Sequence, residues 1–133
     1  IVNASPREAD LAGFTVADRD KDTGEPKLSE GVIFPPGTKL GPGAYGMVQA
    51  GGVDGGKPCP PGAHAFCLRA EFGVSGSGET IFLVGVDGSV VDALEIPADA
   101  TSGDDSWGRI PSGDPGGLFE ATPPTPGSPN LPR

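Results

Sequence analysis

The sequence is poor in the residues that carry catalysis or bind transition metals. Its 133 residues include one histidine, one tryptophan, one tyrosine and two cysteines. A hydrolase triad needs a histidine beside a nucleophile, and a zinc enzyme needs several histidine or cysteine ligands. Neither a GxSxG nor an HExxH pattern occurs. We therefore interpret His64 as a loop residue without chemistry, and we expect neither catalytic residues nor enzymatic activity.

Basic residues are also scarce. The chain has 9 lysines and arginines against 18 aspartates and glutamates, which gives a net charge of −9. Nucleic-acid binding requires clustered basic side chains that neutralise phosphates, and anionic membrane surfaces attract basic segments. We expect neither partner. No apolar run approaches the roughly 20 residues of a transmembrane helix, so no membrane insertion is expected.

Cysteine occurs only as Cys59 and Cys67. Their spacing is too long for a CxxC redox motif, and no further cysteine completes a zinc site. We predict a structural disulfide, which would stabilise the fold by roughly 2–3 kcal/mol because it closes a short loop. A disulfide indicates a protein outside the reducing cytosol. The chain also starts at Ile1 without an initiator methionine, which indicates a processed product or an excised fragment.

Glycine and proline are abundant, with 23 and 16 residues. They separate short apolar runs whose length is typical of strands and not of disordered chain. No window has a sustained helical apolar stripe. We therefore predict an all-β fold, a mostly antiparallel sandwich or small barrel with long irregular loops and little or no helix. The predicted strands are Leu11–Ala17, Val32–Phe34, Tyr45–Ala50, Ala65–Phe72, Glu79–Val86 and Ser89–Ile96.

Two of these strand predictions are the most specific. Asp87-Gly88 separates the last two runs and is a strong signal for a β-hairpin. Residues 65–72 alternate strictly between apolar and other side chains, which indicates a strand with one buried face. The residues predicted on the buried face are Phe66, Leu68, Ala70 and Phe72.

The remaining chain is irregular. Gly51–Gly62 is predicted as a loop, and beyond Pro97 we predict no strong strand, only a short one at Leu118–Phe119. Prolines then become dense, and since they lack a backbone donor they exclude a helix or a central strand. We divide the chain into a β domain at residues 1–121 and a proline-rich extension at residues 122–133.

One acidic loop has the composition of a calcium site. Asp18, Asp20 and Asp22 alternate with Arg19 and Lys21, so three carboxylates lie on one side of the loop. Calcium takes six to eight oxygen ligands, and these carboxylates could supply several of them. The alternative is a solvated acidic loop. No cofactor other than this calcium is expected, although Asp99, Asp104 and Asp105 form a second acidic loop.

Trp107 and Arg109 are the candidate contact residues. A single tryptophan either covers one end of the core or lies exposed as a contact residue, and we favour the first because aromatics are so few. Asp92 is predicted to accept hydrogen bonds from nearby backbone amides, with Arg109 as a candidate charge partner.

Five segments, in order along the chain, resemble motifs of the lamin tail domain family. The first comprises Asn3-Ala4-Ser5 with Asp10–Asp18, and the second runs from Val32 through Pro35-Pro36-Gly37 to Tyr45. The other three are Gly78–Asp92, Gly108–Gly113 and Thr125–Asn130. Together they cover nearly the whole chain, which makes the resemblance specific although each segment alone is weak.

The resemblance implies an immunoglobulin-like β-sandwich without catalytic residues. It also implies a structural or interaction module of a secreted or cell-surface bacterial protein, one that mediates protein association or surface attachment. The alternative is a calcium- or carbohydrate-binding accessory domain of an extracellular nuclease or other hydrolase. The family's first strand is truncated or missing here, because the chain begins at Ile1. We therefore expect an exposed strand edge that favours self-association.

Overall fold

The protein is all-β, as predicted. The structure is a computed structural model that describes residues 1–51 and 58–133. Its strands are β1 (Ala9–Asp10), β2 (Thr15–Asp18), β3 (Val32–Ile33), β4 (Lys39–Leu40), β5 (Tyr45–Gln49), β6 (His64–Arg69), β7 (Glu79–Val84), β8 (Val90–Ile96), β9 (Ser106–Ile110) and β10 (Leu118–Thr122). The helical structure in the described residues is one 3₁₀ turn, η1 (Leu28–Glu30).

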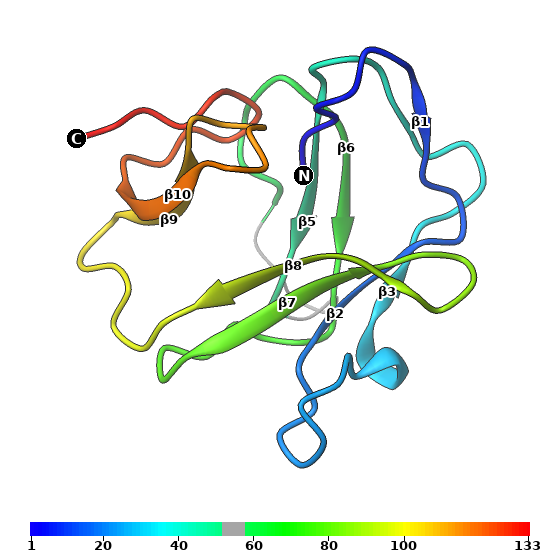
Figure 1. Ribbon diagram of the computed structural model, residues 1–133, viewed down its shortest axis with the longest axis horizontal. Helices are drawn as coiled ribbons and strands as arrows, with labels where there is room; N and C mark the ends of the chain where they lie inside the picture. Colours follow the sequence, from blue (N-terminus) through cyan, green and yellow to red (C-terminus); the bar gives the residue numbers. More distant parts are fainter. Residues whose placement is uncertain (52–57) are drawn as a thin grey trace.

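The largest sheet has the strand order β3–β2–β7–β8 and is antiparallel throughout. In Figure 1 the β5 and β6 strands run across the direction of β7 and β8, and the β9–β10 hairpin lies to one side. This packing of small sheets fits a β-sandwich. In this arrangement the end of β8 and the beginning of β9 lie close enough for a direct hydrogen bond, which is described below.

The predicted β7–β8 hairpin is confirmed. Its two strands pair from Glu79 opposite Ile96 to Val84 opposite Val90, so each strand is shorter at the turn than predicted. The amide of Gly88 donates to the carbonyl of Gly85, and Gly88 has φ 85°. A turn followed by a left-handed glycine is a common hairpin connection, and glycine adopts that conformation without steric cost.

The β5–β6 pair is parallel, whereas the other strand pairs of the described residues are antiparallel, in agreement with the predicted, mostly antiparallel fold. A parallel pair requires a connection that returns to the end of the sheet at which the first strand began. The predicted Gly51–Gly62 loop belongs to this connection, but its residues 52–57 lie outside the described residues. The predicted disulfide joins Cys59 of the connection to Cys67 of β6, with Cα atoms 6.5 Å apart.

The core contains the buried face predicted for residues 65–72. Phe34, Leu40, Ala70 and Phe72 are buried, and Phe66 and Leu68 pack against them. The rings of Phe34 and Phe66 meet edge to face, with centroids 5.4 Å apart. Gly46 on β5 lies directly against the Phe66 ring, in space that a Cβ atom would fill.

The N-terminal half differs in detail from the prediction. The predicted strand Leu11–Ala17 begins only at Thr15, because the amide of Phe14 turns back to the carbonyl of Leu11. Gly13 in this turn has φ 80°, a conformation that favours glycine. The short β1–β4 pair was not predicted. Ile1–Asn3 also pair with β5, through an antiparallel bridge between Val2 and Tyr45.

The prediction of no strong strand after Pro97 is wrong. β9 and β10 form an antiparallel hairpin that pairs Ser106–Ile110 with Leu118–Thr122. The predicted short strand at Leu118–Phe119 is the beginning of β10. The β9 sequence lacks apolar alternation, and its strand conformation depends on partners further along the chain, as β propensity commonly does.

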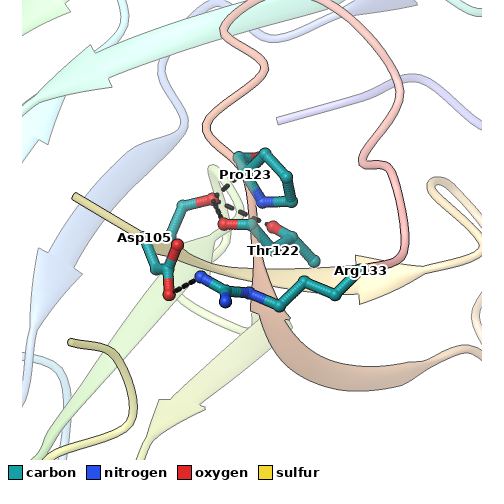
Figure 2. Close-up of polar contacts among 5 residues, drawn as sticks. Asp105, Thr122, Pro123 and Arg133 are labelled. Atoms are coloured by element: carbon teal, nitrogen blue, oxygen red, sulfur yellow. Dashed lines mark hydrogen bonds and ion pairs between the residues drawn. The ribbon is translucent and has the colours of Figure 1, made fainter. Parts of the chain in front are cut away.

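The proline-rich C-terminal segment packs on this hairpin. Figure 2 shows the ion pair between Arg133 and Asp105, beside Thr122 and Pro123. The hydroxyl of Ser106 lies 3.0 Å from that of Thr122, which is fully buried. The side-chain amide of Asn130 donates to the carbonyl of Arg109 at 3.0 Å. Asn130 therefore ties residues 123–133 to β9.

Candidate functional site

Three side chains on the β9–β10 hairpin form a cluster of two aromatic rings and a guanidinium group. Phe119 pairs with Arg109 across the hairpin, and Trp107 precedes Arg109 by two residues on the same face. The rings of Trp107 and Phe119 stack with centroids 6.4 Å apart. The guanidinium carbon of Arg109 lies 4.8 Å from the Phe119 centroid. The structure thus brings the two predicted contact residues together and adds Phe119, which only the strand register reveals.

Trp107 also connects this hairpin to the edge of the large sheet. Its indole Nε1 donates to the backbone carbonyl of Glu95 at 3.3 Å. Two residues earlier on β8, the Ala93 amide donates to the carboxylate of Asp92 at 2.9 Å. β8 is the last strand of its sheet, and unpaired edge groups invite pairing with another chain. These two bonds occupy one carbonyl and one amide of that edge.

The predicted charge pair between Asp92 and Arg109 does not form: no ion pair among the described residues joins these two side chains. Asp92 does accept from a backbone amide, as predicted. Arg109 instead donates from Nη1 to the carbonyl of Asp114 at 3.3 Å and lies over Phe119. The aromatic ring and the turn carbonyl hold the guanidinium on its own hairpin.

A groove of about 500 Å³ lies between the inner face of the large sheet and the β9–β10 hairpin. Val16 and Phe72 of the core line it, together with the half-buried Ile81 and Leu83. Trp107 forms part of the wall and is itself half-buried. Of the two predicted alternatives, this position fits a tryptophan that covers one end of the core better than a tryptophan that is fully exposed.

The outward face of the same sheet carries apolar side chains. Pairing aligns Ile33, Thr15, Val84 and Val90 in one row across all four strands. The β7–β8 register then shifts between Val84 and Leu83, which makes Val91 an extra residue. Such a bulge sets two residues of one strand opposite one residue of its neighbour.

We define the outer patch as Ile33, Val84, Val90 and Val91. The exposed fractions are 66% for Ile33, 48% for Val90 and 56% for Val91, whereas Val84 is buried. The outward face of an antiparallel sandwich sheet is normally polar. An uncharged, aliphatic row on this face is therefore a candidate contact surface.

The stretch of the chain that contains the β7–β8 hairpin is acidic. The sequence has no lysine or arginine between Arg69 and Arg109. The acidic residues in that interval are Glu71, Glu79, Asp87, Asp92, Glu95, Asp99, Asp104 and Asp105. In the hairpin turn, hydrogen bonds from the hydroxyl and amide of Ser89 hold the pKa of Asp87 below its usual value. Asp87 is therefore ionised at neutral pH, in the turn directly before Val90 and Val91.

The structure does not assemble the predicted calcium ligands into a metal site. The described residues contain no group of three or more histidine, cysteine, aspartate or glutamate side chains placed to hold a metal ion. Asp20 accepts from the amides of Asp22 and Thr23, and these bonds lower its pKa. Its carboxylate therefore stabilises its own turn.

Asp18 lies in a different environment from the other two acids of this loop. One of its carboxylate oxygens is buried and has no hydrogen-bond partner among the residues that the structure describes. Burial raises the pKa of Asp18, and the nearby charges of Glu79 and Glu30 raise it further. Asp18 belongs to the end of β2, opposite Ile81 of β7. Its position is set by the sheet, and its charge is unfavourable there.

His64 is the first residue of β6 and not a loop residue as predicted. It is half-buried, and its Nδ1 atom has no hydrogen-bond partner in the part of the chain that the structure describes. His64 lies opposite Tyr45 in the β5–β6 pair, so the pairing of these two strands fixes its position.

No helix among residues 1–51 and 58–133 has the length and apolar character needed to cross a membrane. The disulfide is compatible with an extracellular protein. Comparisons with protein-family models, curated proteins and solved structures found no match for this chain. The resemblance to the lamin tail domain family therefore stays a prediction.

Proposed function

We propose that this chain is a non-catalytic module that mediates protein association in a secreted or cell-surface bacterial protein. The supporting observation is the outer patch, an exposed aliphatic surface on a sheet face that normally carries polar side chains. The immunoglobulin-like, lamin-tail type of sandwich is part of this proposal and rests on the sequence resemblance.

The partner that fits this surface is a protein with an apolar contact flanked by lysine or arginine. Apolar contact with Ile33, Val90 and Val91 would remove their exposed surface from water, which is worth about 25 cal/mol per Å². The net charge of −9 favours a basic partner and repels a second copy of this chain. The sheet face is the proposed contact, since side chains of Trp107 and Asp92 occupy part of the β8 edge.

Selection from a random peptide library displayed on phage tests this proposal. The expected result is enrichment of peptides that combine Val, Ile or Leu with Lys or Arg. Their affinity is expected to fall as salt rises, because charge complementarity contributes to association. The double variant Val90→Ser/Val91→Ser is expected to lose binding.

Leu118→Ser is the matched control, because Leu118 is also an exposed aliphatic residue of a strand, 79% exposed, but lies outside the outer patch. It is expected to bind the selected peptides like the unmodified chain. Enrichment of acidic peptides, equal loss in both variants, or a stable homodimer by sedimentation velocity would overturn the proposal.

A further inference from the structure

We infer that the groove between the large sheet and the β9–β10 hairpin binds a small amphipathic carboxylate, with its alkyl chain in the groove and its carboxylate on Arg109. The groove lies on the inner side of the sheet, whereas the outer patch lies on the outward face. The two surfaces are therefore separate, and this site does not depend on the proposed protein association.

The groove has the size and lining of a small-molecule site. Its volume of about 500 Å³ lies within the range of about 300–1,000 Å³ that is typical of such sites. Ile81 and Leu83 pack against the core yet remain half-buried where they line the groove, and Leu94 adds to it from β8. An alkyl chain in the groove would remove this apolar surface from water, which is favourable.

Arg109 provides the position for the carboxylate. It is the basic side chain that lines the groove in the described part of the molecule. Within residues 1–51 and 58–133, no carboxylate lies within 4.0 Å of its guanidinium group. A guanidinium group binds a carboxylate through two parallel hydrogen bonds, and Phe119 holds the group in place at the groove wall.

Asp92 lines the groove from β8 and is the acidic side chain facing the ligand. Its Oδ1 atom accepts from the Ala93 amide, a role that asparagine can also fill. The charge of Asp92 repels an anion in the groove. Asp92→Asn is therefore expected to strengthen binding of a carboxylate and to leave binding of a neutral ligand unchanged.

Titration of the disulfide-bonded chain with decanoate and with decanol tests the site. Trp107 is the only tryptophan and lines the groove, so its emission reports directly on occupancy. We expect a saturable shift of its emission to shorter wavelength with decanoate, and about tenfold weaker binding of decanol, because charged hydrogen bonds are the stronger ones. Arg109→Gln is expected to remove this preference and leave decanol binding unchanged.

Further variants keep the test decisive. Leu94→Phe fills space in the groove and is expected to weaken both ligands, whereas Val91→Ser in the outer patch changes neither. Arg109→Lys keeps the charge without the two-pronged geometry, so we expect an intermediate preference for decanoate over decanol. This variant also tests the role of Arg109 if Arg109→Gln fails to fold. Absence of a saturable emission change up to the solubility limit of decanoate, equal decanoate and decanol affinity in the unmodified chain, or an unchanged preference for decanoate in Arg109→Gln would overturn the inference.

Discussion

The indole nitrogen of Trp107 donates a hydrogen bond to the main-chain carbonyl of Glu95, at 3.3 Å, and so joins the second hairpin to the edge of the large sheet. These two residues come from different sheets. The bond therefore gives the one tryptophan of the sequence a partner outside its own hairpin. Trp107 lines the groove together with Arg109 and Phe119, and its hydrogen bond occupies one carbonyl of the β8 edge.

Replacing Trp107 by phenylalanine keeps an aromatic ring for Phe119 but removes the donor to Glu95. We expect the free energy of unfolding to fall by about 0.5–1.5 kcal/mol, the usual net contribution of one hydrogen bond. Urea denaturation followed by circular dichroism measures this change. Val86→Ala, at a residue that is 71% exposed in the hairpin turn, serves as the control and is expected to unfold at the unmodified midpoint. Equal midpoints for both variants would contradict the assigned role of Trp107.

Asn130→Ala tests whether the C-terminal segment is integral to the β domain. The Asn130 side chain donates to the carbonyl of Arg109 at 3.0 Å, and it occupies the space beside Gly108 where a Cβ atom would collide. Its loss is expected to cost about 1–2 kcal/mol of unfolding free energy. Leu131→Ala is the matched control, because Leu131 is 56% exposed. A stability like that of the control would show that residues 123–133 are not integral to the β domain.

Removal of the disulfide is expected to lower stability without changing the fold. The bond joins cysteines eight residues apart in the sequence. The chain-entropy model gives a loss of about 2–3 kcal/mol for such a loop. Equilibrium unfolding of Cys59→Ser/Cys67→Ser measures it, and the unmodified chain under reducing conditions should match this variant. If both remain as stable as the oxidised chain, the disulfide is not structural.

Asp18→Asn is expected to stabilise the protein at neutral pH. Burial raises the pKa of Asp18 in the folded state, with Glu79 and Glu30 adding to the shift, above the 3.8 of an unperturbed aspartate. The folded state therefore binds the Asp18 proton more tightly than the unfolded state does. The Asp18 contribution to stability is fully present below pH 3.8 and is lost as pH rises through the folded pKa.

Melting temperatures of the unmodified chain and Asp18→Asn, compared at pH 3 and pH 7, measure this effect. The variant is expected to melt higher at pH 7, with a smaller difference at pH 3. Asp22→Asn is the control from the same loop. A gain for Asp18→Asn that is as large at pH 3 as at pH 7 would show that charge is not the cause.

Local sequence signals predicted the parts of the fold that depend on local contacts. Asp87-Gly88 marks the β7–β8 hairpin, because its turn needs a left-handed glycine. The alternation of residues 65–72 identifies a core-facing strand. By contrast, β9 is held by residues 118–122 and by Asn130, none of which is visible in its own sequence.

The candidate contact surfaces were predictable only in part. Trp107 and Arg109 stand out because such residues are rare in the second half of the chain. Phe119 becomes their neighbour only through the β9–β10 register. The outer patch depends on the bulge that brings Val90 and Val91 onto one face. A bulge follows from the pairing of two strands and has no distinct signature in either strand alone.

A nuclear magnetic resonance titration with a library-selected peptide tests the proposed protein association most directly. With isotope-labelled protein, the largest methyl shift changes are expected at Ile33, Val90 and Val91, with the methyl groups of Leu118 and Leu131 unaffected. Changes confined to the groove residues Leu83 and Leu94, or spread evenly over all methyl groups, would contradict the assignment of the outer patch as the contact surface.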